Sequence, residues 1–224
     1  MILTWLSKIL YCYIYIIQIQ KYRSVSLDKD SLLKSIAIKG YDVGFGAKKH
    51  FATFDLVCKV PNVIALGTLI TGIIQLGFDI PIFTNKVLSL FLIFIGIIAI
   101  FINQYGNRKN EFIEIGVKIN KIYQELRNLY FKVQGTDSVN KEKIEELEQV
   151  YNGLIHQFHD IGITQQIIFS DWYAHYKFFV QLEIEWIEEQ KVFTFKDKVP
   201  MSFRLTMYIS IIAILVIIGC LIIK

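Results

Sequence analysis

Three stretches of this chain contain no charged residue, and each is long enough to cross a lipid bilayer. They cover residues 60–78, 87–107 and 205–223, which makes 19, 21 and 19 residues. A helix rises about 1.5 Å per residue, so roughly 20 apolar residues span a hydrocarbon core of about 30 Å. Only eight residues, Asp79 to Lys86, separate the first two stretches. They therefore predict a transmembrane helical hairpin, and the third stretch predicts a C-terminal transmembrane helix.

Composition and charge narrow the class of protein. Hydrophobic residues make up 54% of the chain, above the level of about 45–50% in soluble domains, and the mean hydropathy is +0.43. Residues 105–200 carry twelve Lys and Arg against fifteen Asp and Glu. Because nucleic-acid-binding surfaces are normally basic, we expect no direct nucleic-acid binding by this polar region. The cysteines Cys12, Cys58 and Cys220 are scattered, which indicates buried thiols rather than a disulfide framework.

The positions of basic residues predict the orientation of the chain in the membrane. Lys and Arg concentrate on the cytoplasmic side of membrane proteins. Here they precede the first uncharged stretch, follow the second and precede the third, while the connection at 79–86 offers only Lys86. We therefore expect residues 1–60 and 105–200 to be cytoplasmic. Five basic residues at the membrane edge are expected to face anionic lipid: Lys48, Lys49, Lys59, Arg108 and Lys109.

Apolar residues after the second stretch recur at heptad spacing. Alternating intervals of 3 and 4 residues define a seam that predicts packing in a hairpin or an oligomer: Phe112, Ile115, Ile119, Ile122, Leu126 and Leu129. The polar segment 135–140 supplies turn and N-cap residues, and the same spacing resumes over 144–158. The two helices predict an antiparallel hairpin. A third helix is expected over 171–190, with its glutamates on a solvated face.

Together these patterns predict an all-α membrane protein, with a transmembrane helical hairpin, a cytoplasmic antiparallel helical hairpin and a C-terminal transmembrane helix. The expected segments are a cytoplasmic amphipathic helix at 26–60, the two-span hairpin at 61–104, a cytoplasmic helical region at 105–200 and the C-terminal span at 201–224. Residues 1–25 are ambiguous, because Lys8 interrupts a tyrosine-rich apolar run. An interfacial or packed helix is favoured there over a fourth span.

Few residues suggest chemistry. His156, His159 and Asp160 lie close together, but no Cys or further His is near in sequence to complete a metal site. An ordinary helix edge is the preferred interpretation. The segment Gly44 to Lys49 contains two glycines and two lysines without the spacing of a phosphate-binding loop. We therefore expect no enzymatic activity, no metal and no cofactor.

The uncharged stretches contain aligned small and polar residues. In the first two spans these residues are Thr68, Thr71, Gly72, Gln75, Ser89, Gly96 and Asn103. One interpretation is that the two stripes face each other, since small residues let transmembrane helices approach and hydroxyls or amides bond across the contact. The other is that oligomerisation turns one stripe toward a central pathway. With no charge in the spans, a proton relay or a charged selectivity ring is not expected.

The order of these segments resembles a known family. A basic amphipathic helix, YDVGFGAKKHFATFDLVCK at 41–59, enters a tight two-span hairpin, and a heptad-patterned helix, NRKNEFIEIGVKINKIYQELRNLYF at 107–131, leaves it. This arrangement resembles the SLATT proteins, the SMODS- and SLOG-associating two-transmembrane effectors of bacterial conflict systems. The likeness covers roughly residues 30–190. The third span is similar to that of a subfamily linked to reverse transcriptases.

The resemblance implies a function. It implies a multi-pass protein of the bacterial inner membrane, with a cytoplasmic N-terminus, that forms homo-oligomers in the lipid bilayer. It implies an antiphage effector that perforates the membrane and arrests growth once a partner senses infection. The sensor would be a nucleotidyltransferase, a SLOG protein or a reverse transcriptase from the same operon. Two alternatives stay open: a non-conducting scaffold that recruits a soluble partner through its coiled hairpin, and a small constitutive channel.

Overall fold

The computed structural model describes residues 28–161 and 165–222, and these residues are helical with no β-strand. The prediction of an all-α protein is confirmed. The segment 1–25 with Cys12 lies outside the described residues, as do residues 162–164. The helices are α2 Lys29–Gly77, α3 Ile82–Asn103, α4 Lys109–Gly135, α5 Lys141–Asp160, α6 Ser170–Gln181, α7 Glu185–Glu188, α8 Phe195–Lys198 and α9 Met201–Ile222, with a 3-10 turn, η1, at Gly106–Arg108.

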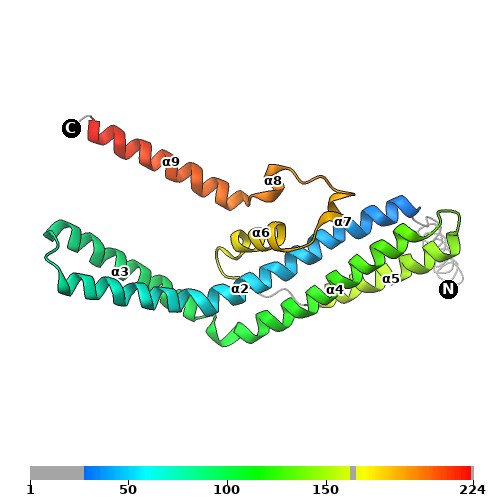
Figure 1. The fold of residues 1–224 in the computed structure, drawn as a ribbon, viewed down its shortest axis with the longest axis horizontal. Helices are drawn as coiled ribbons and strands as arrows, with labels where there is room; N and C mark the ends of the chain where they lie inside the picture. The colour runs from blue at the N-terminus through cyan, green and yellow to red at the C-terminus, as the bar shows by residue number, and fades with distance from the viewer. Residues whose placement is uncertain (1–27, 162–164, 223–224) are drawn as a thin grey trace, which may run out of the picture.

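Helix α2 joins the part predicted to be cytoplasmic to the predicted membrane hairpin without a break. It runs for 49 residues, and the Asp28 carboxylate caps its start by accepting a hydrogen bond from the Ser31 amide at 2.9 Å. Pro61 lies inside the helix, where it removes one backbone hydrogen bond. The amphipathic segment expected at 26–60 and the first span therefore belong to one helix. Figure 1 shows α2 passing from the helical bundle into the hairpin.

The hairpin of α2 and α3 stands apart from the other helices. Two helical stretches are long and apolar enough to cross a membrane, α2 and the stretch that begins with α3 at Ile82. Most side chains of α2 from Asn62 onward and of α3 are exposed in a single copy, as expected for helices that meet lipid. Helix α9 extends toward the same end of the molecule as the hairpin tip (Figure 1). Its apolar part counts only as a shorter apolar helix, Met201–Ile212, among the described residues, so the third span stays a prediction.

The half of α2 that is predicted to be cytoplasmic is the centre of a helical bundle, named the cytoplasmic bundle after this prediction. It packs most extensively on α4 and also contacts α5, α6 and α7. Helix α5 runs back along α4 (Figure 1). In the predicted seam of α4, five side chains are buried and Ile115 is half-buried. The seam therefore contributes to the core of this bundle, whose largest interface is between α4 and α2.

Close approach in the bundle depends on two glycines of α2. A Cβ atom on Gly40 would lie 2.2 Å from the indole ring of Trp186, and one on Gly44 would lie 2.8 Å from the ring of Tyr123. Trp186 is only 2% exposed and donates a hydrogen bond from its indole N–H to the Tyr123 hydroxyl at 3.1 Å. Tyr123 in turn donates to the carbonyl of Glu183 at 2.8 Å. The short helix α7 is thereby fixed against α2 and α4.

The prediction of one helix over 171–190 is wrong. Helix α6 ends at Gln181 and α7 begins at Glu185, because Leu182 is extended with ψ 140°. This break turns Ile184 and Trp186 into the core. The glutamates of the segment are exposed, as predicted, but Glu183 lies 2.5 Å from Arg127 and Glu189 accepts a hydrogen bond from Tyr130 at 2.6 Å.

Candidate functional site

The tip of the membrane hairpin holds a polar cluster. The side-chain amide of Gln75, near the end of α2, donates to the Asn85 side-chain oxygen at 2.6 Å and lies 3.3 Å from the Ser89 hydroxyl. Ser89 donates to the backbone carbonyl of Asn85 at 2.9 Å. Gln75 is half-buried, and the cluster joins the last turn of α2 to the first two turns of α3. These bonds fix the two spans against each other close to the 78–81 turn.

The other predicted span residues do not join this cluster. The Thr71 hydroxyl donates to the Gly67 carbonyl one turn earlier, at 2.8 Å. Thr68 and Asn103 are exposed, and Gly72 and Gly96 are half-buried with open space where a Cβ would stand. The structure thus brings together Gln75 and Ser89 from the two stripes. It leaves the rest of each stripe accessible from outside the hairpin.

Replacing Gln75 by leucine tests the role of the tip cluster. We expect the variant to lose about 0.6–1.7 kcal/mol of hairpin stability, the range measured for hydrogen bonds between transmembrane helices. Thermal unfolding of the purified protein in detergent measures the effect. Thr84→Val, an exposed polar change in the same turn region, is the matched control. An equal loss in both variants contradicts a specific role for Gln75.

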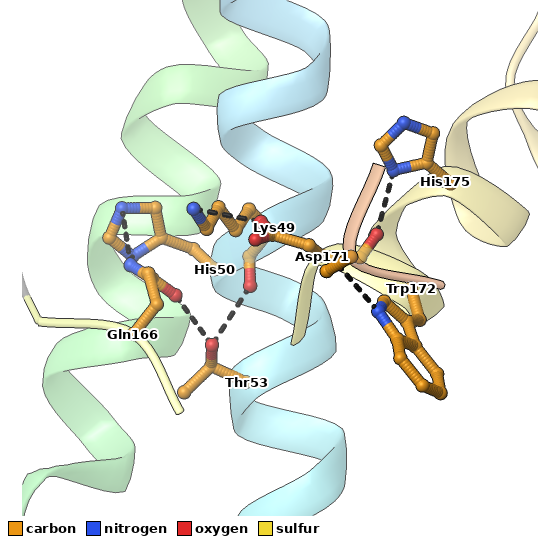
Figure 2. Close-up of polar contacts among 8 residues, drawn as sticks. Lys49, His50, Thr53, Gln166, Asp171, Trp172 and His175 are labelled. Carbon is orange, nitrogen blue, oxygen red and sulfur yellow. Dashed lines mark hydrogen bonds and ion pairs between the residues drawn. The ribbon is translucent and has the colours of Figure 1, made fainter. Parts of the chain in front are cut away.

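A second polar cluster lies where the bundle meets the membrane hairpin. Figure 2 shows His50 and Thr53 of α2 beside Gln166, which precedes α6. The Thr53 hydroxyl lies 2.5 Å from the side-chain oxygen of Gln166 and 3.0 Å from the carbonyl of Lys49. The Gln166 side-chain nitrogen lies 3.3 Å from His50 Nε2. Burial lowers the pKa of His50 to about 4, the charge of Lys49 adds to the lowering and Glu111 opposes it. His50 is therefore neutral at pH 7.

Two further contacts connect α2, α6 and α9 at the same level. Lys49 forms an ion pair with Asp171 at 2.8 Å, which joins α2 to α6. The indole N–H of Trp172 donates to the Ser202 hydroxyl at 2.9 Å, and the Trp172 ring packs edge-on against Phe203 at 4.9 Å. Figure 2 shows Lys49 and Asp171 side by side, with Trp172 next along α6. The start of the C-terminal helix α9 is thus tied to α6, and α6 is tied to α2.

The basic residues predicted to face lipid lie around this junction, and most have protein partners. Lys59 pairs with Asp55 at 2.9 Å, and Arg108 pairs with Glu111 at 2.7 Å. Lys48 lies over the ring of Phe51 at 5.9 Å, and Lys109 is exposed at the start of α4. Together with Lys49 they occupy the part of α2 before the first span and the chain just after α3. Their contact with anionic lipid stays a prediction.

The cluster of His156, His159 and Asp160 lies on α5, in the cytoplasmic bundle. All three side chains are exposed. Across the residues that the structure describes, no three His, Cys, Asp or Glu side chains come together in a metal-binding group.

Several residues of these clusters have no direct signal in the sequence. Asn85 belongs to the short segment between the two spans, where a lone amide is an ordinary turn residue. Gln166 and Trp172 lie far from α2 in the sequence, so no periodicity relates them to it. The one local signal was Gln75, an amide at the end of an otherwise apolar run, since such a group needs a hydrogen-bonding partner in lipid.

Comparison with known proteins gives one match. The family model described as SMODS and SLOG-associating 2TM effector domain 6 matches residues 27–207. This range includes the membrane hairpin, the whole cytoplasmic bundle and the start of α9. No curated protein and no solved structure is significantly similar to the chain.

Proposed function

The chain belongs to the family of SMODS and SLOG-associating 2TM effector domains, and from this membership we propose that it forms a pore when triggered. Membership in this family also makes it a membrane effector of conflict systems. One observation carries the proposal. A single copy leaves polar and small residues of both spans, among them Thr68 and Ser89, exposed on the hairpin surface. Polar side chains on a lipid-facing surface favour association with further helices. Several copies of the hairpin can therefore enclose a pathway lined by these groups.

The side chains that line such a pathway determine which ions pass through it. The two spans contain hydroxyl, amide and apolar side chains and no charge, so the proposed pore is weakly selective among ions. Opening it would depolarise the bacterial inner membrane and arrest growth. The exposed rings of Phe91 and Phe94 can close the pathway by excluding water in the resting state.

The cytoplasmic bundle is proposed to control assembly. Because α2 is continuous from the bundle into the first span, a rearrangement of the bundle moves the span directly. The proposed orientation places the N-terminus and the bundle in the cytoplasm, where a sensor protein encoded in the same operon can reach them. A nucleotidyltransferase, a SLOG protein or a reverse transcriptase suits that role.

Induced expression together with the neighbouring operon genes tests the pore. We expect loss of membrane potential, read with a voltage-sensitive dye, followed by growth arrest. Thr71→Lys and Gly96→Lys should abolish both effects, since a lysine at the centre of a span costs about 3 kcal/mol and would block an uncharged pathway. Ile73→Lys is the matched control for the energetic cost of placing a lysine in a membrane span, because Ile73 is exposed on the same helix as Thr71. Immunoblots of the membrane fraction check that all three variants insert.

The results separate the pore from other functions. Normal potential and viability with the operon active would refute the pore. Loss of activity in Ile73→Lys as complete as in Thr71→Lys, at equal membrane levels, would remove the assignment of Thr71 to the pathway. Conductance of the purified protein in liposomes without any trigger would instead favour a constitutive channel.

A scaffold is the second candidate function, and one surface favours it. A groove of about 700 Å³ runs between α4 and α5, with the apolar residues Phe131 and Val150 exposed along it. Exposed apolar side chains gathered in a groove favour protein binding, and here the charged residues Glu125, Lys132, Lys143 and Glu146 line the same groove. Replacing both spans by a poly-leucine hairpin distinguishes the two functions. A scaffold would keep its activity after this exchange, and a pore would lose it.

A further inference from the structure

Two cavities meet at the junction between the bundle and the hairpin. One, about 570 Å³, is named the polar cavity because its wall includes Lys49, Asp171, Ser202 and Thr206, although Ile167, Ile168, Phe169 and Trp172 give it apolar surface as well. The other is an apolar groove of about 410 Å³ between α2 and α3. The loop residues 167–169 line both cavities. A single ligand with a polar end and an apolar end could therefore occupy both.

The apolar groove lies at the cytoplasmic edge of the predicted spans. Its walls come from Leu56 and Val60 of α2, Ile98 and Phe101 of α3, and the loop residue Ile168. Val60 begins the first uncharged stretch, and Ile98 and Phe101 belong to the last part of the second. The groove is thus continuous with the surface that meets the acyl chains of the bilayer.

The polar cavity lies further from the predicted spans than the apolar groove does. Lys49 precedes Leu56 by seven residues of the same helix, a rise of about 10 Å. The two cavities adjoin, because residues 167–169 line both of them. A lipid whose chain lies in the groove would therefore place its headgroup next to Lys49 and Asp171.

The shared loop is shaped to face this site. Phe169 has φ 69°, a left-handed conformation that a bulky side chain rarely adopts, and its ring packs edge-on against Trp172 with the ring centroids 4.7 Å apart. Ile168 and Phe169 are nevertheless 61% and 57% exposed. Large apolar side chains held outward beside an apolar groove are suited to contact a hydrocarbon chain.

We propose that this junction binds one phospholipid of the cytoplasmic leaflet, with an acyl chain in the apolar groove and a zwitterionic headgroup in the polar cavity. The charges on the wall match such a headgroup. The Lys49 ammonium suits the phosphate, and the Asp171 carboxylate suits the ammonium of an aminophospholipid. Both side chains keep a solvent-exposed part, 33% and 48%, beyond their mutual ion pair. The site rests on insertion of the hairpin in a membrane and does not depend on pore formation.

Native mass spectrometry of the delipidated full chain in detergent tests the proposal with a series of probes. We expect one phosphatidylethanolamine per chain to be retained at the lowest concentration. Diacylglycerol lacks the headgroup and glycerophosphoethanolamine lacks the chains, so each should need at least about tenfold more ligand. Phosphatidylglycerol has no ammonium for Asp171, so it should bind more weakly than phosphatidylethanolamine and more tightly than diacylglycerol or glycerophosphoethanolamine. This series uses the unmodified chain and does not depend on the folding of any variant.

Matched variants locate the site. Ile98→Trp fills the apolar groove and should reduce retention of phosphatidylethanolamine at least about tenfold. Ile100→Trp, on the same helix at a position 68% exposed and outside the groove, should leave retention unchanged. Asp171→Asn should remove the preference for phosphatidylethanolamine over phosphatidylglycerol.

Three outcomes would overturn the proposal. Equal retention of all two-chain lipids, with no difference between Ile98→Trp and Ile100→Trp, would mean annular lipid only. Binding of glycerophosphoethanolamine or inorganic phosphate as tightly as the intact lipid would indicate a soluble ligand. A preference for phosphatidylethanolamine that survives Asp171→Asn would place the headgroup elsewhere. None of these results bears on whether the hairpin conducts ions, which the dye measurement tests separately.

Discussion

Replacing Trp186 by alanine is expected to lower the free energy of unfolding of the cytoplasmic bundle by about 3–5 kcal/mol. The indole is 2% exposed and packs against the rings of Tyr123 and Tyr130, with centroids 5.7 and 5.2 Å away. Its removal leaves a cavity against Gly40 and takes a hydrogen-bond donor from the Tyr123 hydroxyl. Because domains are typically stable by about 5–15 kcal/mol, this loss would bring the bundle close to unfolding.

Urea unfolding of the purified full chain, followed by far-ultraviolet circular dichroism, measures the change. Val192→Ala, at a strongly exposed position a few residues later, is the control and should be nearly neutral. Gly40→Ala adds a second test, since its methyl group would clash with the indole. The clash should destabilise the protein with Trp186 in place and disappear in the Trp186→Ala background. Strict additivity of the two changes would contradict the packing described for α7.

The sequence predicted the elements of this fold better than their contacts. The uncharged stretches and heptad intervals are local patterns, and they correctly placed α3, α4 and α5 and the antiparallel return of α5. Periodicity shows which face of a helix is apolar but not which helix covers it. For that reason the apolar seam of α4 predicts packing in a hairpin or an oligomer without naming the partner, and the largest interface of α4 is with α2.

The clusters at the junction and at the tip were beyond prediction for a related reason. Lys49 and Asp171 are 122 positions apart in the sequence, and their contact depends on how the loop before α6 places the start of that helix against α2. Trp186 shows the same limit, since a continuous helix over 171–190 would place it on the face of Phe178. The turn at 182–184 instead sends it against Gly40. Such turns depend on tertiary packing, which overrides local propensity.

The joined contacts at the junction suggest how a signal in the bundle reaches the membrane. Helix α2 is shared by both parts, and α9 is held to α6 by the hydrogen bond between Trp172 and Ser202. A change in the position of α6 would therefore act on the first span through Lys49 and on α9 through Trp172. Helices α2 and α9 are thus coupled through the start of α6.

Acid should destabilise the bundle through His50. The side chain is 5% exposed and lies among Lys49, Glu111, Phe112 and Gln166. Burial, the largest cause, lowers its pKa from 6.5 to about 4. The unfolded chain therefore binds a proton that the folded chain excludes as pH falls below 6.5. A pKa difference of this size between the unfolded and folded states corresponds to about 3 kcal/mol in the free energy of unfolding. The stability that the folded state owes to a neutral His50 is fully present above pH 6.5 and is lost progressively down to about pH 4.

Urea unfolding above, within and below this window checks the effect, with His50→Gln as the decisive variant. Glutamine cannot titrate, so the variant should lose about 3 kcal/mol less than the wild type across the window. His156→Gln, at an exposed position on α5, should behave as the wild type does. Asp55 does not confuse the result: burial raises its pKa, hydrogen bonds from Lys177 and Lys59 more than offset this, and the net pKa lies below 3.8. Stability from Asp55 is present above pH 3.8 and is lost only as pH falls further. Equal acid sensitivity of the wild type and His50→Gln would show that His50 is not kept neutral by the fold.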